Sequence, residues 1–363
     1  MASVTHPDLG ATTEGLTVAA AFAAAIKGRT IIITGINKLG IGYATAEALA
    51  SQAPRRLILA GRSTVKVQEC VDTLRSQYAT VDYRFLHVDL SSQKSARTAA
   101  AQVLSWTDTP TIDIVINNAG VMHIPTRTLS EDGIELHLAT NHIGHFLFTN
   151  LIMPKLVAAA KSNKVPGLTR IINISSVGTA ISALRASDPN FTKPASQLPE
   201  REKPNFAMMR MAKLDVDEEM VYFPFAAYGQ SKTANVLYSV GLNERLFEKH
   251  GLLSVALHPG EIKSELQRNT DPKWLEGVMK YKENNNMPWK TLGQGASTTL
   301  VAALDPKLGE AGSGAGADGD GGWQTPFLSD CQIGKTQGYA LDKGDAARLW
   351  EISEAWVGEK FQW

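Results

Sequence analysis

A tyrosine and a lysine four residues apart, Tyr228 and Lys232, form the pair in this sequence best suited to proton transfer. On a helix, this spacing places both side chains on one face. A nearby ammonium stabilises a phenolate, so we expect Lys232 to lower the pKa of Tyr228 from about 10 towards the working pH. Tyr228 could then give a proton to a nascent alkoxide or take one from an alcohol. Because the spacing is also common on ordinary helix faces, the pair gains its meaning from the residues that accompany it.

Polar residues at the ends of two predicted strands accompany the pair. Ser175 and Ser176 end one strand, residues 117–120 (Asn-Asn-Ala-Gly) end another, and Asn141 lies in a long predicted helix. Since neighbouring strand residues point in opposite directions, only one serine should face the site. Each residue alone could equally be a turn former or a helix cap. Their joint order at the carboxyl edge of a sheet favours one functional site.

A glycine turn, residues 34–42 (Thr-Gly-Ile-Asn-Lys-Leu-Gly-Ile-Gly), follows the first predicted strand and opens a helix. Such a turn aims bare backbone amides and a helix N-terminus at a pyrophosphate, and glycine permits the close approach. A purely structural turn is the alternative. The cofactor-binding residues that we predict in this turn are Gly35, Lys38, Leu39, Gly40 and Ile41.

The end of the second predicted strand indicates which dinucleotide is bound. An acidic residue there would pair with the ribose hydroxyls of NAD, whereas an arginine accommodates the 2′-phosphate of NADP. This strand ends in Gly61, Arg62 and Ser63, with no acid, and Lys38 adds a second positive charge in the glycine turn. A solvated surface arginine is the alternative. The sequence therefore favours NADP(H) as cofactor.

The elements that must position these residues alternate between short apolar strands and longer helices. The predicted strands are residues 30–34, 56–60, 83–88, 112–117, 170–175 and 252–258. The predicted helices are residues 42–51, 66–78, 94–106, 135–160 and 228–250. Apolar strands separated by helices argue for a parallel sheet covered on both faces. We predict an α/β fold with a single doubly wound Rossmann domain over residues 28–345 and a mostly parallel sheet of about seven strands.

Residues 180–227 interrupt this alternation just before the Tyr-x-x-x-Lys helix. They contain five prolines, an acidic run and the methionines Met208, Met209 and Met211. A sheet crossover of ordinary length cannot account for this segment, so we interpret it as an insertion and expect a substrate lid. The methionines could line an apolar pocket or pack a core of the insertion itself.

The flanking segments carry less information about function. Residues 1–27 predict an N-terminal extension with a short surface helix, in which Leu16, Ala20, Ala23 and Lys27 fall at helical spacing. Residues 309–322 are glycine-rich and predict a mobile surface loop. Residues 346–363 predict a C-terminal helix and tail. Three tryptophans, Trp350, Trp356 and Trp363, should anchor this last helix, and a homodimer contact there is left open.

Composition excludes several classes of partner. Among 363 residues, 36 Lys and Arg balance 36 Asp and Glu, so no basic surface predicts nucleic-acid binding. The two cysteines, Cys70 and Cys331, form neither a disulfide framework nor a zinc spacing, which favours a reducing, cytoplasmic location. The apolar run at residues 16–26 is too short to span a membrane, and Asp8 and Glu14 precede it where a signal peptide would be basic.

Three histidines, His137, His142 and His145, suggest a metal cluster at first sight. We expect no metal site there, because no carboxylate or thiol accompanies them at ligand spacing and His137 lies off the helix face of the other two.

In combination, these motifs resemble the short-chain dehydrogenase/reductase family over residues 28–305. The segment 141–146 (Asn-His-Ile-Gly-His-Phe) is similar to the retinol-dehydrogenase-like branch, and the long insertion and tail resemble its fungal members. The positions that carry the resemblance are the glycine turn, Asp89, residues 117–120, Asn141, Ser176, Tyr228, Lys232 and residues 258–260.

The resemblance implies a role for each matching residue. Tyr228 would be the general acid/base, Lys232 would hold the nicotinamide ribose, Ser176 would bind the substrate oxygen, and Asn141 would anchor a proton-relaying water. The remaining implied cofactor contacts are Asp89 and Leu90 at the adenine, Asn118, Ala119 and Gly120 along the dinucleotide, and Pro259, Gly260, Ile262 and Ser264 around the nicotinamide amide.

Two departures from the family pattern put details in doubt. One extra residue lies between Gly35 and Gly40, which affects the amide contacts and the reach of Lys38. The stretch between Ser176 and Tyr228 is also far longer than is usual for the family.

The resulting hypothesis is an NADP(H)-dependent carbonyl reductase, equally able to run as an alcohol dehydrogenase. An apolar lid favours a bulky hydrophobic substrate, such as a compound of secondary metabolism. The alternatives are a catalytically retired NADP-binding sensor or partner protein, and a non-redox isomerase or cyclase that uses the same pocket. Stoichiometric consumption of NADPH separates the first from the other two.

Overall fold

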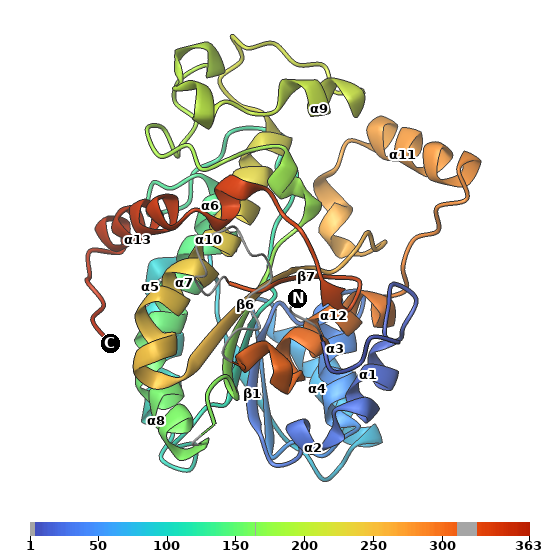
Figure 1. Ribbon diagram of the computed structural model, residues 1–363, viewed down its shortest axis with the longest axis vertical. Helices are drawn as coiled ribbons and strands as arrows, with labels where there is room; N and C mark the ends of the chain where they lie inside the picture. Colours follow the sequence, from blue (N-terminus) through green and yellow to red (C-terminus); the bar gives the residue numbers. More distant parts are fainter. Residues whose placement is uncertain (1–3, 164, 311–324) are drawn as a thin grey trace.

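Eight strands form one sheet in the computed structural model, which describes residues 4–163, 165–310 and 325–363. Their order is β3-β2-β1-β4-β5-β6-β7-β8, with seven strands parallel and β8 antiparallel to β7 (Figure 1). The strand bounds are Thr30–Thr34 (β1), Arg56–Gly61 (β2), Asp82–His87 (β3), Ile114–Asn117 (β4), Thr169–Ile174 (β5), Leu252–His258 (β6), Phe327–Ser329 (β7) and Gln332–Ile333 (β8). The predicted doubly wound sheet is confirmed, with two short C-terminal strands that the sequence analysis did not locate.

The central strands are apolar throughout because both faces of the sheet are covered. All five residues of β1 are buried, and the side chains of Ile31 and Ile33 pack in one layer while Ile32 packs in the other. β4 repeats this alternation with Val115 on the Ile32 side. Continuous burial with a period of two is typical of a sheet covered by helices on both sides.

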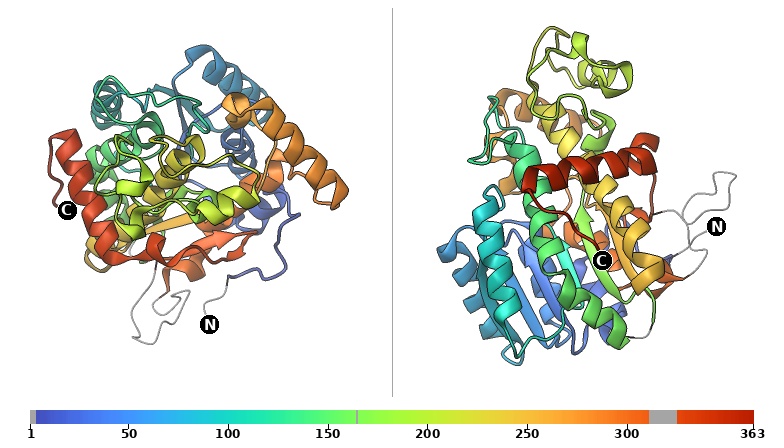
Figure 2. Two further views of the ribbon diagram at one scale, coloured as in Figure 1. Left: turned by 90° about the horizontal axis from the view of Figure 1, so that it is seen from above. Right: turned by 90° about the vertical axis from the view of Figure 1, so that its left-hand side faces the viewer.

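Helices form the two covering layers. On one face lie α1 (Gly15–Ala21), α2 (Ala23–Ile26), α3 (Ile41–Ala50), α4 (Thr64–Gln77) and α12 (Leu292–Leu304). On the other lie α5 (Gln93–Ser105), α6 (Leu136–Leu138), α7 (Gly144–Leu151), α8 (Met153–Asn163), α10 (Pro224–His250) and α13 (Lys343–Val357). Helices α5, α7 and α10 run side by side over the sheet, and α13 crosses α10 (Figure 2, right).

The single helix predicted over residues 135–160 is wrong, because the chain there is divided. A π-helical turn, Ala139–Ile143, separates α6 from α7, and α7 meets α8 at 61°. Pro154 at the start of α8 cannot donate the backbone hydrogen bond that would continue α7, which accounts for the bend. The π turn places Asn141 at the distorted part of the segment, where functional residues often lie.

Two segments stand above the carboxyl edge of the sheet. One is the insertion before α10, with α9 (Phe206–Met211), and the other carries α11 (Pro272–Asn284) (Figure 1). The insertion has its own small core, in which Met209 is buried beside Phe191 and Phe223. The short 3-10 turns near these segments are Val177–Ala180, Ala195–Gln197, Glu200–Glu202, Glu265–Asn269 and Gly338–Leu341, and a further one, Pro306–Gly309, follows α12.

The N-terminal helix region packs through a different face from the one predicted. Leu16, Ala20 and Lys27 are exposed, whereas Val18, Ala19, Phe22 and Ile26 are buried against α3 and α12. The helix also breaks at Phe22, between α1 and α2. Its apolar face is therefore set by the larger side chains rather than by the run of alanines.

At the C-terminus, Trp350 is buried in α13 against Phe146, with ring centroids 5.0 Å apart. Trp356 and Trp363 are half-buried at the edge of the same core. Most of the predicted glycine-rich loop at residues 309–322 lies outside the described residues. Within the described parts of the chain, no single helix is long and apolar enough to cross a membrane. One bent pair of helices, Leu136–Leu151 with Met153–Asn163, is long and apolar enough only when the two are taken together.

The close approach of α7 to the loop after β3 gives a stability prediction. At Gly144 an added Cβ would overlap the backbone carbonyl of Leu90, and neither backbone can move cheaply. We expect Gly144→Ala to lower the free energy of unfolding by about 3 kcal/mol in chemical denaturation. Gly277→Ala is the matched control, because nothing lies within 4 Å of a Cβ there. It should change stability by less than about 1 kcal/mol, in the stabilising direction. Equal stability of the two variants would contradict the packing described.

Candidate active site

A cleft of about 940 Å³ lies at the carboxyl edge of the sheet, under the insertion and α11. Its floor is formed by the ends of β1, β2, β4, β5 and β6, which is where doubly wound folds bind ligands. Most residues predicted from the sequence as cofactor or catalytic groups line it, including Gly35, Arg62, Ser176 and Tyr228. The predicted residues that do not line it are Lys38, Leu39 and Asn141.

The glycine turn is locked against the loop that follows β4. Gly35 has a φ of +76°, and a Cβ there would lie 2.6 Å from the Cα of Ala119. Asn118 Nδ2 donates to the Thr34 carbonyl at 2.7 Å, while Thr34 Oγ1 accepts from the amides of Asn118 and Ala119. Asn118 is therefore a structural link between the two loops. No side chain caps the N-terminus of α3 at Gly40, which leaves its first amides available to an anion.

Two cations lie beyond the end of β2. Arg62 is 70% exposed at the cleft rim, 3.8 Å from a carboxylate oxygen of Asp89. Lys66, which the sequence analysis did not single out, also lines the cleft and pairs with Glu265 at 2.9 Å. By contrast, the Nζ of Lys38 contacts the ring and hydroxyl of Tyr43. The positive charge at this end of the cleft thus comes from Arg62 and Lys66.

Two of the catalytic candidates, Tyr228 and Lys232, lie on the first turns of α10, and Ser176 follows β5 beside them. Tyr228 is 6% exposed and Lys232 is 3% exposed. The two adjacent serines diverge as expected for a strand end: Ser175 Oγ donates to the Lys232 carbonyl at 2.7 Å, whereas Ser176 is a hydrogen-bond partner of the Tyr228 phenol. Gly178 allows this contact, because a Cβ there would lie 3.2 Å from the Tyr228 ring.

Burial governs the ionisation of both groups. It raises the pKa of Tyr228 to about 12, against the lowering effect of the Ser176 hydrogen bond. It lowers the pKa of Lys232 to about 8. The Lys232 Nζ donates to the Ile174 carbonyl at 2.9 Å and lies 5.7 Å from the centre of the Tyr228 ring. We expected Lys232 to lower the pKa of Tyr228. In the folded chain the pKa is raised instead, because desolvation of the phenol is the largest effect.

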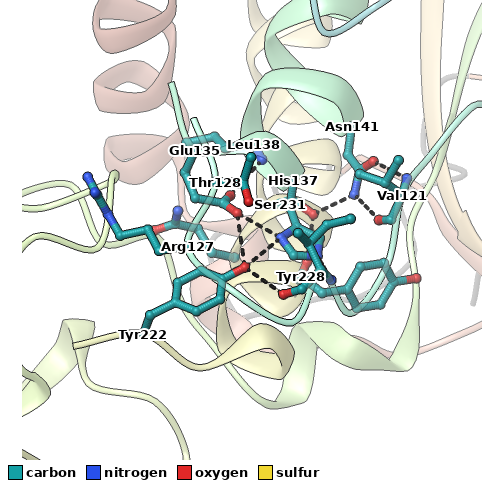
Figure 3. Close-up of polar contacts among 12 residues, drawn as sticks. Val121, Arg127, Thr128, Glu135, His137, Leu138, Asn141, Tyr222, Tyr228 and Ser231 are labelled. Carbon is teal, nitrogen blue, oxygen red and sulfur yellow. Dashed lines mark hydrogen bonds and ion pairs between the residues drawn. The ribbon is translucent and has the colours of Figure 1, made fainter. Parts of the chain in front are cut away.

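Asn141 ties the loop after β4 to α10 (Figure 3). Its Nδ2 donates to the Val121 carbonyl at 3.0 Å and to Ser231 Oγ at 2.8 Å, and its Oδ1 accepts from the Val121 amide at 2.8 Å. Ser231 in turn donates to the Tyr228 carbonyl at 2.7 Å. These contacts use both amide hydrogens of Asn141 and one lone pair of its oxygen, and they position the loop and the helix against each other.

A buried carboxylate accompanies the histidines, which corrects the sequence analysis. Glu135 Oε1 lies 2.7 Å from His137 Nδ1, and both side chains are fully buried (Figure 3). His145 Nδ1 meets the Asn141 carbonyl, and His142 Nε2 meets Ser353. Each histidine thus has its own partner in the core. In the parts of the chain that the structure covers, no group of three or more His, Cys, Asp or Glu side chains could hold a metal ion.

Apart from Met208, one of the methionines expected either to line a pocket or to pack the insertion, the outer wall of the cleft was missed by the sequence analysis. It is apolar and aromatic, and its main members are Met122, His123, Ile181, Met208, Phe225, Trp274, Leu275, Val278 and Trp289. Trp274 Nε1 donates to the Ala212 carbonyl at 3.1 Å, which ties α11 to the end of α9. Met122 and His123 directly follow the Asn-Asn-Ala-Gly run, so extending that motif by three residues would have found them.

The end of the cleft that was predicted to hold the nicotinamide amide is formed after β6, where Pro259, Gly260, Ile262 and Ser264 line the wall. Gly260 has a φ of +97°, which favours glycine, and Ser264 caps the next 3-10 turn by accepting from the Leu266 amide. Asp89 and Leu90 line the opposite end. The predicted residues of the two ends are thus on one continuous surface.

Comparison with known proteins gives consistent matches. The family model described as short chain dehydrogenase matches residues 29–187. The oxidoreductase fscI of Fusarium equiseti is 37% identical over 249 residues, covering 69% of this chain and 93% of that protein. Retinol dehydrogenase 12 of Mus musculus is 30% identical over 338 residues, covering 93% of this chain and 88% of that protein. Both relatives are matched over most of their length.

Solved structures share the fold. A putative uncharacterized protein from Mycobacterium paratuberculosis is 26% identical with a TM-score of 0.62, covering 94% of this chain and 98% of that one. An NADPH-bound carbonyl reductase from chicken fatty liver is 20% identical with a TM-score of 0.51, covering 77% of this chain and 94% of that one.

The buried ammonium of Lys232 gives a prediction about pH. The unfolded chain binds the Lys232 proton with a pKa near 10.5, and the folded chain with a pKa of about 8. Between these values the unfolded state holds more protons, so raising the pH stabilises the fold. From pH 8 to pH 10, the free energy of unfolding should rise by about 2 kcal/mol more in the wild type than in Lys232→Met. Denaturant titrations at each pH measure this difference. Parallel pH profiles for the two proteins would show that Lys232 is not a desolvated cation.

Proposed function

This chain belongs to the short-chain dehydrogenase/reductase family, in its retinol-dehydrogenase-like branch, and from that premise we propose that it is an NADP(H)-dependent oxidoreductase. It transfers a hydride between the nicotinamide and a carbonyl or alcohol, with Tyr228 as the general acid/base. One observation carries the proposal: a buried phenol, its serine partner and a buried ammonium lie at the sheet edge where the glycine turn and Arg62 open onto the same cleft.

The residues of the cleft fit a phosphorylated dinucleotide. The uncapped first turn of α3 suits a pyrophosphate, and Gly35, which has no Cβ, lets the glycine turn pack closely against Ala119. Arg62, with Lys66 nearby, suits a 2′-phosphate. Asp89 would hold the adenine, and Pro259 and its neighbours would hold the nicotinamide amide. When bound, the nicotinamide supplies or accepts the hydride.

Tyr228 and Ser176 are the groups that handle the substrate oxygen. A carbonyl that receives a hydride at carbon needs a proton at oxygen, and Tyr228 Oη can donate it while Ser176 Oγ donates a hydrogen bond to the developing alkoxide. Because burial raises the pKa of Tyr228 to about 12, the phenol is protonated at neutral pH, which suits the reductive direction. Alcohol oxidation, which needs the phenolate, should be favoured by high pH. Lys232 is placed to hold ribose hydroxyls and to stabilise the phenolate when it forms.

The substrate is a bulky apolar molecule. Phe225, Trp274, Leu275 and Val278 form a continuous apolar wall beyond Tyr228, under the insertion and α11. We propose that residues 180–227 act as a substrate lid together with the α11 segment, since Trp274 joins the two at the Ala212 carbonyl. Such a covered, dry space would strengthen the electrostatic contacts made to the reacting oxygen.

The two free cysteines, Cys70 and Cys331, are buried and unpaired with each other. They suit a reducing compartment, and we place the protein in the cytoplasm on this ground.

The role of Tyr228 is tested by removing only its hydroxyl. Tyr228→Phe should lower kcat for carbonyl reduction by about 10³-fold, because it removes the proton donor of the proposed mechanism, while leaving the Kd for NADPH within about threefold. NADPH absorbance and NADPH fluorescence measure the two quantities. Tyr78→Phe, the same change at the end of α4 and outside the cleft, is the control. Near-normal turnover in Tyr228→Phe would refute the assignment.

The cofactor preference is tested at Arg62. Arg62→Asp should lower the ratio of kcat/KM with NADPH to that with NADH by at least about tenfold, because a carboxylate repels the 2′-phosphate and pairs with ribose hydroxyls. Arg75→Asp, on the exposed side of α4, controls for the change in net charge. An unchanged ratio in Arg62→Asp would overturn the argument for NADP.

A further inference from the structure

His123 is a buried histidine of the cleft for which the proposed mechanism has no use. It lies in the loop after β4, is 7% exposed, and lines the cleft on the side away from the glycine turn. Its φ is +52°, a left-handed conformation that is uncommon for residues other than glycine. Such conformations persist where the surroundings impose them, and they concentrate at functional sites.

The side chain of His123 has one hydrogen-bond partner and three aromatic neighbours. Its Nδ1 lies 2.9 Å from Thr270 Oγ1, in the segment that leads into α11. Its ring lies 3.8 Å from the Phe225 ring, 5.7 Å from the Tyr228 ring and 5.8 Å from the Trp274 ring, measured between centroids. In the described chain no hydrogen bond is formed by its Nε2, and the residue lines the cleft.

The next residue, Ile124, is fixed through both of its backbone groups. Its amide donates to His137 Nε2 at 3.1 Å, and its carbonyl accepts from Tyr222 Oη at 3.0 Å. Because an amide can only donate, His137 Nε2 must be the acceptor, so Nδ1 carries the ring hydrogen and donates to Glu135 (Figure 3). The buried Glu135–His137 pair, together with the partly buried Tyr222, therefore holds the loop that carries His123.

Burial keeps His123 uncharged, since desolvation, with His137 nearby, lowers its pKa to about 3. A neutral imidazole is a polar hydrogen-bonding group that carries no charge in an otherwise aromatic wall. Phe225 and Trp274, 4.8 Å apart between ring centroids, are neighbours of this group in the same wall. An aromatic wall with one open ring nitrogen suits a flat molecule that has a polar substituent at a fixed place.

We propose that His123 is a specificity residue, and that its Nε2 hydrogen-bonds a second oxygen function of a planar aromatic or conjugated substrate whose reacting carbonyl lies at Tyr228. The proposal rests on the proposed function for the identity of the reacting group. It adds a substrate class: aryl or conjugated ketones and aldehydes that carry a hydroxyl or a further carbonyl in addition to the group that is reduced. The second group is bound but not altered.

The test uses rigid substrates, so that the separation of the two oxygens is fixed. The probes are 1-tetralone and its 5-, 6- and 7-hydroxy derivatives, assayed with NADPH. At least one hydroxy isomer should exceed the parent in kcat/KM by about tenfold, the effect of one well-placed hydrogen bond in a dry site. His123→Leu should bring this ratio to about one, and His123→Gln, which keeps a hydrogen-bonding group of similar reach, should retain most of it.

The controls separate this role from a structural one. His6→Leu makes the same change in the N-terminal segment, outside the cleft, and should keep the wild-type ratio. If His123→Leu does not fold, His123→Asn replaces it, because asparagine tolerates the left-handed backbone but is shorter. A wild type without preference among the ketones, or a His123 variant that slows all of them equally, would overturn the proposal.

Failure of the proposed function would appear differently, as an absence of NADPH consumption with every ketone. The same ratio of hydroxy isomer to parent is then measured as binding, through quenching of tryptophan emission in the wild type and in the His123 variants. Loss of the preference in His123→Leu would support the role of His123 there too, and equal binding of all four ketones would refute it.

Discussion

A lysine ammonium buried without a carboxylate partner is the constraint on which this site depends. Lys232 meets the Ile174 carbonyl, and none of the ion pairs formed by the described residues includes it. Burial of such a charge is unfavourable by several kcal/mol, so the surroundings must hold it firmly. Helix α10 does so, with 27 residues running through the core from Pro224 to His250. The same dry environment keeps the neighbouring phenol protonated. A substrate oxygen and ribose hydroxyls would supply the contacts that both groups lack.

The loop after β4 connects the two ends of the cleft. Near its start, Asn118 and Ala119 are bonded to Thr34 and so fix the glycine turn. In its middle, Val121 is held by Asn141, which also reaches α10. Further on, Ile124, beside His123, is held by the buried His137 and the partly buried Tyr222. A shift of this one loop would therefore disturb the glycine turn, helix α10 and the outer wall of the cleft together.

The sequence predicted the sheet, and it predicted that Tyr228 and Lys232 lie close together, because both features rest on local patterns. Strands such as β1 are buried over their whole length, which leaves a continuous apolar run, and Tyr228 and Lys232 share one helix face at short spacing. The helix at 135–160 was mispredicted because a π turn and Pro154 interrupt a periodicity that otherwise continues. Helix α11 was missed although Trp274, Leu275 and Val278 have helical spacing; these residues line the cleft, and Lys282 is the one buried residue of the helix. The Glu135–His137 contact depends on a local fold that spacing alone does not specify.

The pKa of Tyr228 is a further property that the sequence alone did not predict correctly. Spacing indicates that a cation is near the phenol, but it does not indicate how far both are removed from water, and that removal decides the sign of the shift. In the folded chain desolvation raises the pKa of Tyr228. The protein is thereby set up as a proton donor at neutral pH, with the ammonium available to the phenolate once the proton has left.

The most direct test of the account is to follow a deuterium label. NADPH deuterated at the transferable position of the nicotinamide ring is incubated with the enzyme and a ketone that it reduces, and the alcohol is examined by mass spectrometry. The account predicts one deuterium on the carbinol carbon, with the hydroxyl proton derived from solvent. An alcohol whose carbinol carbon carries only solvent hydrogen, or the absence of any reduced product across a broad panel of carbonyl compounds, would contradict it.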